Sequence, residues 1–414
     1  MKFIVTLIPI YLAFLILLPA AGIFAAHPAA AQGGGNPKAQ AIIKRMSSAE
    51  RKEFFSLSRP ERRAYIRQRL GKGREAPPAP VSKPTPPSGG TVTAPIQGLY
   101  FIDAHSQMDE NVDEARVISL MDHAGVYRTI LSNHMRRPWS DIPKFAKSRP
   151  GRIVPSVRIK GRGYHGRGSA VDFYERLSAQ INSGAHRSMS EVHLWHDSDG
   201  GKYQEIKVDF EDKLVLAAFA GARKKGWPFI IHIEFASLSD GGRNSYMQKL
   251  GAFLKANPEH NFILIHMAQL EESPVRRLLD AHPNLHFMMS HASTFYQGRG
   301  KPFINMFDGH AFKPNWKKLI GERPDRFIFA LDNVFSRFWT PELYLAKMEL
   351  WWRALAQLPA PAAHALAHGN AERLWKLAPK PADAIAMPPW IAKDKLGPVT
   401  GHSAGRMQRG RRRR

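Results

Sequence analysis

Histidine and acidic residues recur at the ends of short apolar segments in the middle of this 414-residue chain. Imidazole and carboxylate groups bind divalent metal ions and transfer protons in enzymes. Because the chain contains no cysteine, a metal ion would need nitrogen and oxygen ligands. The candidate residues are His105, Gln107, His134, Arg158, His193, His196, His232, Glu234, His266, His291 and Asp332.

One group of these residues could hold a metal ion. Side chains alternate along a strand, so Asp103, His105 and Gln107 are expected to point inward together. If His232 and Asp332 also point inward, two imidazoles and a carboxylate would surround one divalent ion and leave a position for water. Such an ion lowers the pKa of its water to about 7 and polarises a substrate carbonyl.

The elements that position these residues are apolar runs, each followed by a segment of helical periodicity. Examples of the helical segments are 209–225 and 273–282. Strand and helix alternating in this way predict an α/β fold, a (β/α)8 TIM barrel, with the site at the carboxyl ends of the strands. A doubly wound open sheet is the alternative, but its Gly-rich turn after the first strand is missing. The predicted strands are 99–105, 128–134, 153–159, 189–195, 228–234, 261–268, 285–291 and 327–334.

The N-terminus has the layout of a signal peptide. Lys2 precedes an apolar run over 3–26, and the small residues 29–31 suit cleavage after Ala31. This pattern predicts a signal peptide over 1–31 and a periplasmic or secreted protein. The run is also long enough to span a bilayer, so an uncleaved segment would anchor the protein in the inner membrane.

The regions around the predicted barrel are basic or rich in proline. We expect a basic helical segment over 36–75, a Pro-rich linker over 76–97, the barrel over 98–378 and a basic tail over 379–414. In the helical segment Ser47 precedes Glu50 in a capping-box pattern.

The formal net charge of the chain is +25. The basic termini are solvated tails or contacts to an anionic surface of lipid or polysaccharide. Nucleic acid is not indicated, because no zinc finger or RNA-binding motif is present. The sequence does not indicate an oligomeric state.

Short motifs resemble the amidohydrolase superfamily, specifically the amidohydrolase family 2 branch of hydrolases and decarboxylases. The segment 102–107 is similar to the first-strand Asp-x-His-x-His motif, and 369–375 is similar to the Gly-Asn-Ala-x-Arg-Leu segment of the last helix. His232 ends the fifth predicted strand, His266 ends the sixth and Asp332 lies in the eighth, which is similar to that family. The resemblance covers about 98–378.

This resemblance implies roles for individual residues. His105, His232 and Asp332 would bind one divalent metal, zinc or another ion such as manganese. Asp332 would also take the proton of the attacking water, and His266 would orient or polarise the substrate.

Gln107 departs from the family pattern because it stands where the family has a second histidine. It could be a weak metal ligand, or His193 or Glu191 could replace it, or the site could hold no metal.

We therefore expect an exported metal-dependent hydrolase that cleaves a C–N or C–O bond in a small anionic substrate. Arg158 and the cationic loop 160–168 would receive an anionic group, with His193 and His291 also contacting the substrate. A metal-dependent decarboxylase is one alternative. A non-catalytic barrel that binds a ligand or partner is the other.

Overall fold

The structure is a computed structural model that describes residues 46, 47, 50, 54, 65, 96–166, 168–199, 201, 203–296 and 301–384. Contacts between residues divide the chain into two units, 1–88 and 89–414. The predicted signal peptide, nearly all of the Pro-rich linker and the tail beyond residue 384 lie outside the described residues. Within the described residues, no helix is both long enough and apolar enough to cross a membrane.

In the first unit, the predicted capping box has the expected hydrogen bonds. The Ser47 amide donates to Glu50 Oε2 at 2.8 Å, and the Glu50 amide donates to Ser47 Oγ at 3.2 Å. The rings of Phe54 and Tyr65 lie 5.5 Å apart. The two reciprocal hydrogen bonds between Ser47 and Glu50 form the capping box that the sequence pattern indicated.

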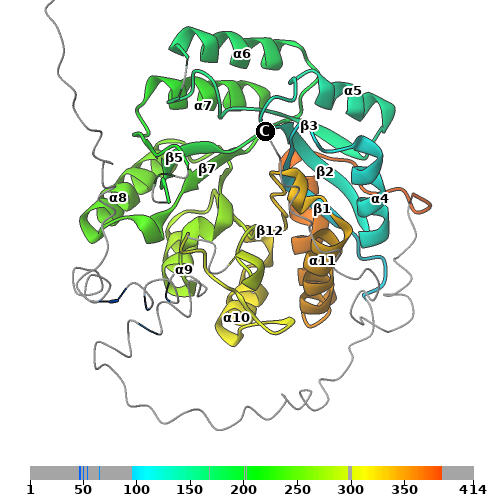
Figure 1. Ribbon diagram of the computed structural model, residues 1–414. Coiled ribbons are helices and arrows are strands. Elements are labelled where there is room, and N and C mark those ends of the chain that lie inside the picture. The colour runs from blue at the N-terminus through cyan, green and yellow to red at the C-terminus, as the bar shows by residue number, and fades with distance from the viewer. Residues whose placement is uncertain are drawn as a thin grey trace, which may run out of the picture. The chain divides into compact units, whose positions relative to one another are not determined.

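The second unit is an α/β fold built on parallel half-barrel sheets that surround a centre (Figure 1). Each predicted strand position contains a parallel strand. One sheet has the order β1 (Phe101–Met108), β2 (Val126–Asn133), β3 (Ile153–Val157) and β4 (Ser188–Met189). The other has the order β12 (Phe327–Ile328), β9 (Leu285–Met288), β8 (Phe262–Leu264), β7 (Phe229–Ile233) and β5 (Val192–His196), with the antiparallel β6 (Ile206–Lys207) at its edge.

The two sheets are connected at both ends. Only Ser190 and Glu191 separate β4 from β5 in the chain. On the other side, the Gln107 amide donates to Asn333 O at 2.7 Å, and the Asp332 amide donates to His105 O at 2.8 Å. Backbone hydrogen bonds therefore join β1 to the chain that follows β12.

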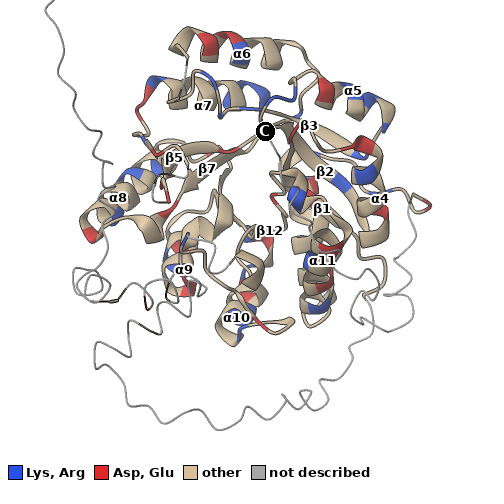
Figure 2. Cartoon of the chain, viewed as in Figure 1, with Lys and Arg blue, Asp and Glu red and all other residues tan. Residues whose placement is uncertain are grey.

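Helices cover the outside of the sheets (Figure 1), and both signs of charge are spread over them (Figure 2). Helix α7 shows how their ends are specified: Asp212 caps its first turn, and Gly226 ends it with a left-handed φ of 65°. The helices are α4 (Glu114–Ala124), α5 (Asp141–Ser148), α6 (Ala170–Asn182), α7 (Lys213–Lys225), α8 (Asp240–Ala256), α9 (Glu272–Ala281), α10 (Pro314–Glu322), α11 (Pro341–Leu355), α12 (Ala360–His364) and α13 (Asn370–Trp375). A short hairpin, β10 (Phe307–Asp308) and β11 (Ala311–Phe312), precedes α10.

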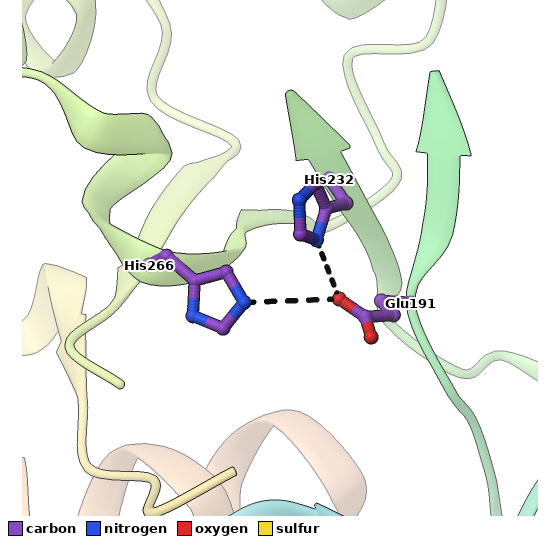
Figure 3. A group of neighbouring side chains, drawn as sticks. All are labelled: Glu191, His232 and His266. Atoms are coloured by element: carbon purple, nitrogen blue, oxygen red, sulfur yellow. Dashed lines mark hydrogen bonds and ion pairs between the residues drawn. The ribbon is translucent and has the colours of Figure 1, made fainter. Parts of the chain in front are cut away.

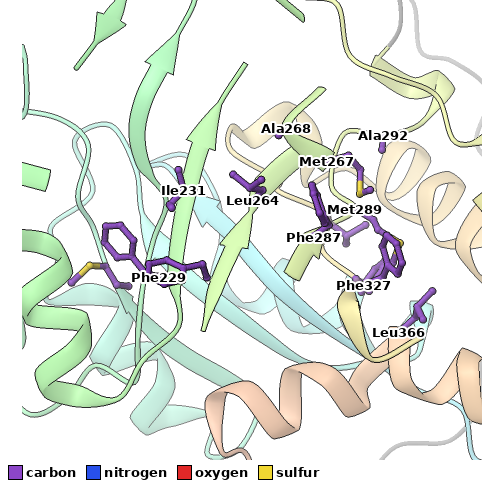
Figure 4. Packing of buried hydrophobic residues seen from close by; sticks show 14 of the residues in the cluster. Phe229, Ile231, Leu264, Met267, Ala268, Phe287, Met289, Ala292, Phe327 and Leu366 are labelled. Carbon is purple, nitrogen blue, oxygen red and sulfur yellow. The ribbon is translucent and has the colours of Figure 1, made fainter. Parts of the chain in front are cut away.

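Alternation along the strands divides the core into two clusters. Phe229 and Ile231 of β7 belong to the larger cluster, which includes the buried faces of the helices (Figure 4). Ile230 belongs to a smaller cluster with Ile263 and Ile328 from neighbouring strands. Because side chains two residues apart share a strand face, Ile230 and His232 of β7 point the same way. The smaller apolar cluster is therefore on the face that carries the polar residues.

Several strands are shorter than predicted. β8 ends at Leu264 rather than 268, because the next residues from His266 to Gln269 all have positive φ angles. β9 and β12 also end early, at Met288 and Ile328. The prediction of long strands was wrong here because apolar composition alone does not show where the backbone leaves the extended conformation.

The expectation that Asp103 would point inward with His105 and Gln107 was wrong. Register shifts interrupt the pairing of β1 with β2 between Asp103 and Ser106, which breaks the simple alternation of sides. Asp103 instead accepts hydrogen bonds from Ser106 Oγ at 2.6 Å and from the Leu331 amide at 2.8 Å. It links β1 to the chain after β12.

Candidate functional site

Buried polar side chains meet where the strands end. Glu191, between β4 and β5, lies at the centre of one group (Figure 3). Its Oε2 atom is 2.7 Å from His232 Nδ1 and 4.0 Å from His266 Nε2. All three side chains are buried.

Asp332 lies on the other side of the same group. Its carboxylate oxygens are 3.5 Å from His105 Nε2, 3.4 Å from His266 Nε2 and 3.3 Å from His291 Nε2. His105 Nε2 also lies 3.9 Å from Glu191 Oε1. Residues from both sheets thus bring imidazole and carboxylate groups within a few ångströms of one another.

Gln107 is part of this cluster and faces the carboxylates with its amide nitrogen. Gln107 Nε2 donates to Asp332 Oδ1 at 3.3 Å and to Glu191 Oε1 at 3.4 Å. Gln107 Oε1 is buried and has no hydrogen-bond partner among the described residues. A buried acceptor without a partner is costly, so the amide is not fully satisfied by protein groups.

Two further groups approach Glu191. Lys160, which follows β3, places Nζ 2.5 Å from Glu191 Oε1, and His193 Nε2 is 3.4 Å from the same oxygen. Lys160 was part of the cationic loop in the sequence prediction, but no strand pattern indicated that its side chain reaches Glu191. The position of Glu191 was easier to anticipate, because it is two residues before His193.

His232 contacts a second carboxylate, that of Glu234, on the side of its ring opposite Glu191. Glu234 Oε1 is 3.2 Å from His232 Nε2 and 2.5 Å from Lys301 Nζ. His196 Nε2 lies 3.0 Å from the same ammonium group. Lys301 is in a loop far away in the sequence, and its role could not be recognised from local pattern.

Burial sets the protonation of most histidines in the site. Loss of water contact lowers the pKa of His105 to about 4 and lowers the pKa values of His193, His266 and His291 well below the usual range. These imidazoles are therefore neutral near pH 7 and keep a lone pair for a metal ion or a proton.

His232 differs from them. Burial lowers its pKa, but the adjacent Glu191 and Glu234 carboxylates outweigh this effect and raise the pKa to about 8. Burial also acts to raise the pKa of Glu191 and Glu234, yet their cationic neighbours hold both below the usual range.

Asp332 has the opposite shift. Its burial, reinforced by the charge of Glu191, raises its pKa to about 7. A carboxyl group that titrates near neutral pH can both accept and donate a proton under physiological conditions.

Three site residues have left-handed backbone conformations. The φ angles are 57° at His266, 59° at His291 and 45° at Asp332, each shortly after a strand ends. Residues with a Cβ atom rarely adopt such angles, and the conformation costs about 1–2 kcal/mol per residue. The surrounding packing maintains these strained backbone conformations. They turn the three side chains toward one another.

The structure brings most of the predicted residues together but not Arg158. His105, Gln107, His193, His232, His266, His291 and Asp332 all lie in the cluster described above. The Arg158 guanidinium instead donates to Lys160 O at 2.9 Å and to Met135 O at 2.8 Å. These bonds engage Arg158 with backbone carbonyls, so its contact with a substrate stays a prediction.

Comparison with known proteins concerns mainly the second half of the chain. A family model described as an amidohydrolase matches residues 190–377. No curated protein matches the chain. The match includes His232, His266 and Asp332, whereas the segment with His105 and Gln107 precedes it.

Several solved structures are similar to the chain. An uncharacterised TIM-barrel protein of Bordetella bronchiseptica is 15% identical over 63% of this chain and 82% of that chain, with a TM-score of 0.43. An amidohydrolase of Burkholderia multivorans with bound zinc is 15% identical over 68% and 100% of the two chains, with a TM-score of 0.41. The 2,6-dihydroxybenzoate decarboxylase of Rhizobium is 14% identical over 67% and 99%, also with a TM-score of 0.41.

Structural similarity at these sequence identities and TM-scores does not indicate which reaction the protein performs. The match to the family model is more specific than these structural similarities, because it aligns the sequence over more than half of the predicted barrel. The match of the amidohydrolase family model to residues 190–377 confirms the resemblance that the sequence motifs indicated.

Proposed function

We propose that this protein is a metal-dependent hydrolase that cleaves a C–N or C–O bond in a small anionic substrate. The observation that carries the proposal is that two groups of possible ligands share Glu191, one with His105 and Asp332 and one with His232 and His266, with neighbouring ligand atoms 2.7–4.0 Å apart. Ligand atoms about 2.1 Å from a common metal ion are separated by distances of this order.

The barrel that carries the site is, we infer, a closed (β/α)8 barrel. Support comes from the short β4 to β5 connection and from the backbone hydrogen bonds of His105 and Gln107 to the chain after β12. Closure matters for function because it brings side chains from β1 and from the end of β12 to the same opening.

The residues present fit a divalent ion. His105, His232 and Asp332 would hold it, and Glu191 would take the place of the missing second histidine of the first strand. The neutral imidazole of His105, whose Nε2 atom lies 3.5 Å from the Asp332 carboxylate and 3.9 Å from the Glu191 carboxylate, is suited to a cation. When bound, zinc or manganese would lower the pKa of a water molecule and polarise a carbonyl group.

Asp332 would handle the proton in the reaction. Its carboxyl group lies 3.4 Å from His266 Nε2 and would lie beside the ion, where it can accept a proton from water and return it to a leaving group. His266 would orient the substrate, with its Nδ1 atom held by Ser290 Oγ at 3.0 Å. Lys160 would attract the negative charge of the substrate toward the site.

Metal content and turnover of substituted proteins test this proposal. We expect His232→Ala and Asp332→Ala to abolish turnover and reduce bound metal while the midpoint of thermal unfolding changes little. Asp325→Asn, an exposed substitution, is the matched control and should behave as wild type. The proposal is wrong if both site variants retain the metal content of wild type, because the two residues are then structural. A wild-type protein that takes up no metal would instead favour a non-catalytic binding barrel.

A decarboxylase is the second candidate, and Asp332 is the observation that favours it. In the metal-free protein, burial and the charge of Glu191 raise the pKa of this carboxyl group to about 7, so it holds a proton more readily than an ordinary aspartate and could protonate a carbanion-like carbon. Reaction of small lactones, amides and aromatic acids in oxygen-18 water separates the two reactions. Hydrolysis transfers the label to the organic product, whereas decarboxylation releases carbon dioxide and adds only a proton to the product.

Export is also part of the proposal. It is supported by the Lys2, apolar run and Ala31 pattern at the N-terminus. Contact of the basic termini with anionic lipid or polysaccharide would keep such a protein near the cell envelope.

A further inference from the structure

We infer that Glu234 is a positioning residue that holds the His232 ring with its proton on Nε2, and that Lys301 fixes Glu234 for this task. The inference rests on the metal-dependent function proposed above. It goes beyond that function by assigning two residues outside the proposed metal ligands, which determine the atom that His232 presents to the cation.

The two nitrogens of His232 face different surroundings. Nδ1 points to Glu191, which lies within 4.0 Å of both His105 Nε2 and His266 Nε2. Nε2 points away from these groups, to Glu234 Oε1 at 3.2 Å. Both nitrogens face a carboxylate, so each can carry a proton in the metal-free ring. A cation on the Glu191 side would take the place of the Nδ1 proton, and the Nε2 N–H would then stay on Glu234.

Glu234 is held in place by hydrogen bonds from several directions. Its Oε2 atom accepts from the Asp197 amide at 2.8 Å, which leaves Oε1 for His232. Its own amide donates to Trp195 O at 3.2 Å, and its carbonyl accepts from Ser237 Oγ at 2.8 Å. The side chain is almost completely buried. Glu234 therefore has little freedom to move away from the His232 ring.

Lys301 supplies the charge that balances Glu234. Its Nζ atom lies 2.5 Å from Glu234 Oε1 and donates to His196 Nε2 at 3.0 Å. His196 can accept this bond because its Nδ1 atom faces Gln204 O at 3.1 Å and carries the proton. A buried carboxylate without a cation would be destabilised, so Lys301 keeps Glu234 both ionised and correctly placed.

Such partners have a measurable effect on metal binding. A carboxylate on the second ring nitrogen fixes the orientation of a metal-ligating histidine and increases its basicity, and removing it costs about 10- to 100-fold in metal affinity. We expect a loss of this size when Glu234 no longer accepts the bond from His232 Nε2.

The test measures zinc affinity of the full-length protein by competition with a chromophoric chelator. Glu234→Ala should lose about 10- to 100-fold in affinity. Glu234→Gln should lose less, because an amide oxygen can still accept the Nε2 hydrogen bond. Lys301→Met should also weaken binding, but it should add little to Glu234→Ala, since it acts through that carboxylate.

Glu349→Gln is the matched control. Glu349 is also a buried glutamate that binds a cation, with Oε1 2.8 Å from the Arg353 guanidinium, but it is on α11 and outside the site. This variant can lose stability without losing zinc affinity. Nitrogen-15 spectra of labelled histidine in the zinc-loaded protein give a second readout, in which His232 should carry its proton on Nε2 in wild type.

The possible results separate this inference from the proposed function. If wild type binds zinc and Glu234→Ala binds it equally tightly, with or without a lower unfolding midpoint, Glu234 is only structural and the inference is overturned. A proton on Nδ1 in the zinc-loaded wild type overturns it as well. If wild type takes up no zinc at all, the proposed metal-dependent function fails first.

Discussion

Gln107 is the residue in which this site departs most from the family pattern, and its effect can be measured directly. Its amide nitrogen faces Glu191 and Asp332, so it donates hydrogen bonds where a histidine would offer a lone pair. We expect Gln107→His to raise zinc affinity, because imidazole is the better zinc ligand. Elemental analysis and chelator competition would check this. Gln357→His, just after the C-terminal end of α11, should leave affinity unchanged. Equal affinity in the Gln107 variant and in wild type would mean that Gln107 does not face the ion.

Asp332 should make the stability of the metal-free protein depend on pH. Its folded pKa of about 7 exceeds the ordinary value of 3.8, so the unfolded chain releases this proton first as pH rises. The free energy of unfolding of wild type, relative to Asp332→Asn, should therefore fall between about pH 4 and pH 7 and then level off. Urea unfolding in the presence of a chelator measures this difference. A difference that is constant with pH would show that the Asp332 carboxyl is not perturbed by burial.

At the scale of elements, Ser106 connects β1 to the chain after β12. The Ser106 hydroxyl donates to Asp103 Oδ2 at 2.6 Å and accepts from the Asn333 amide at 3.0 Å. Ser106→Ala leaves both buried partners unsatisfied and should lower the free energy of unfolding by about 1–3 kcal/mol. Denaturant titration tests this. Ser132→Ala on β2 is the matched control, since the buried Ser132 Oγ has no hydrogen-bond partner among the described residues; similar losses in both variants would refute the role of Ser106.

At the scale of the whole molecule, the N-terminus should direct the chain out of the cytoplasm. We expect the mature protein to begin at Gln32, because the small residues before it suit signal peptidase. Intact-mass measurement of protein from the periplasmic fraction checks this outcome, with Ala31→Arg as a variant in which cleavage should fail. Full-length protein extracted only with membranes would show instead that the apolar run remains as an anchor.

The sequence by itself indicated the resemblance to the amidohydrolase family, the positions of the strands and most members of the polar cluster. These features depend on local pattern: apolar runs mark buried strands, and polar residues at their ends, such as His232, stand out against them. The extents of β8 and β12 could not be predicted, because the left-handed angles at His266 and Asp332 depend on packing around the strand ends.

Only the tertiary structure decided which groups surround each candidate side chain. Lys301 lies 67 residues from Glu234 in the chain, yet the two side chains form an ion pair. Asp103 was expected beside His105 in the site, but an irregular pairing of β1 turns it toward Leu331. Composition and spacing identify residues that can do chemistry. The partners that set their charge and orientation come from distant segments, and only folding brings these together.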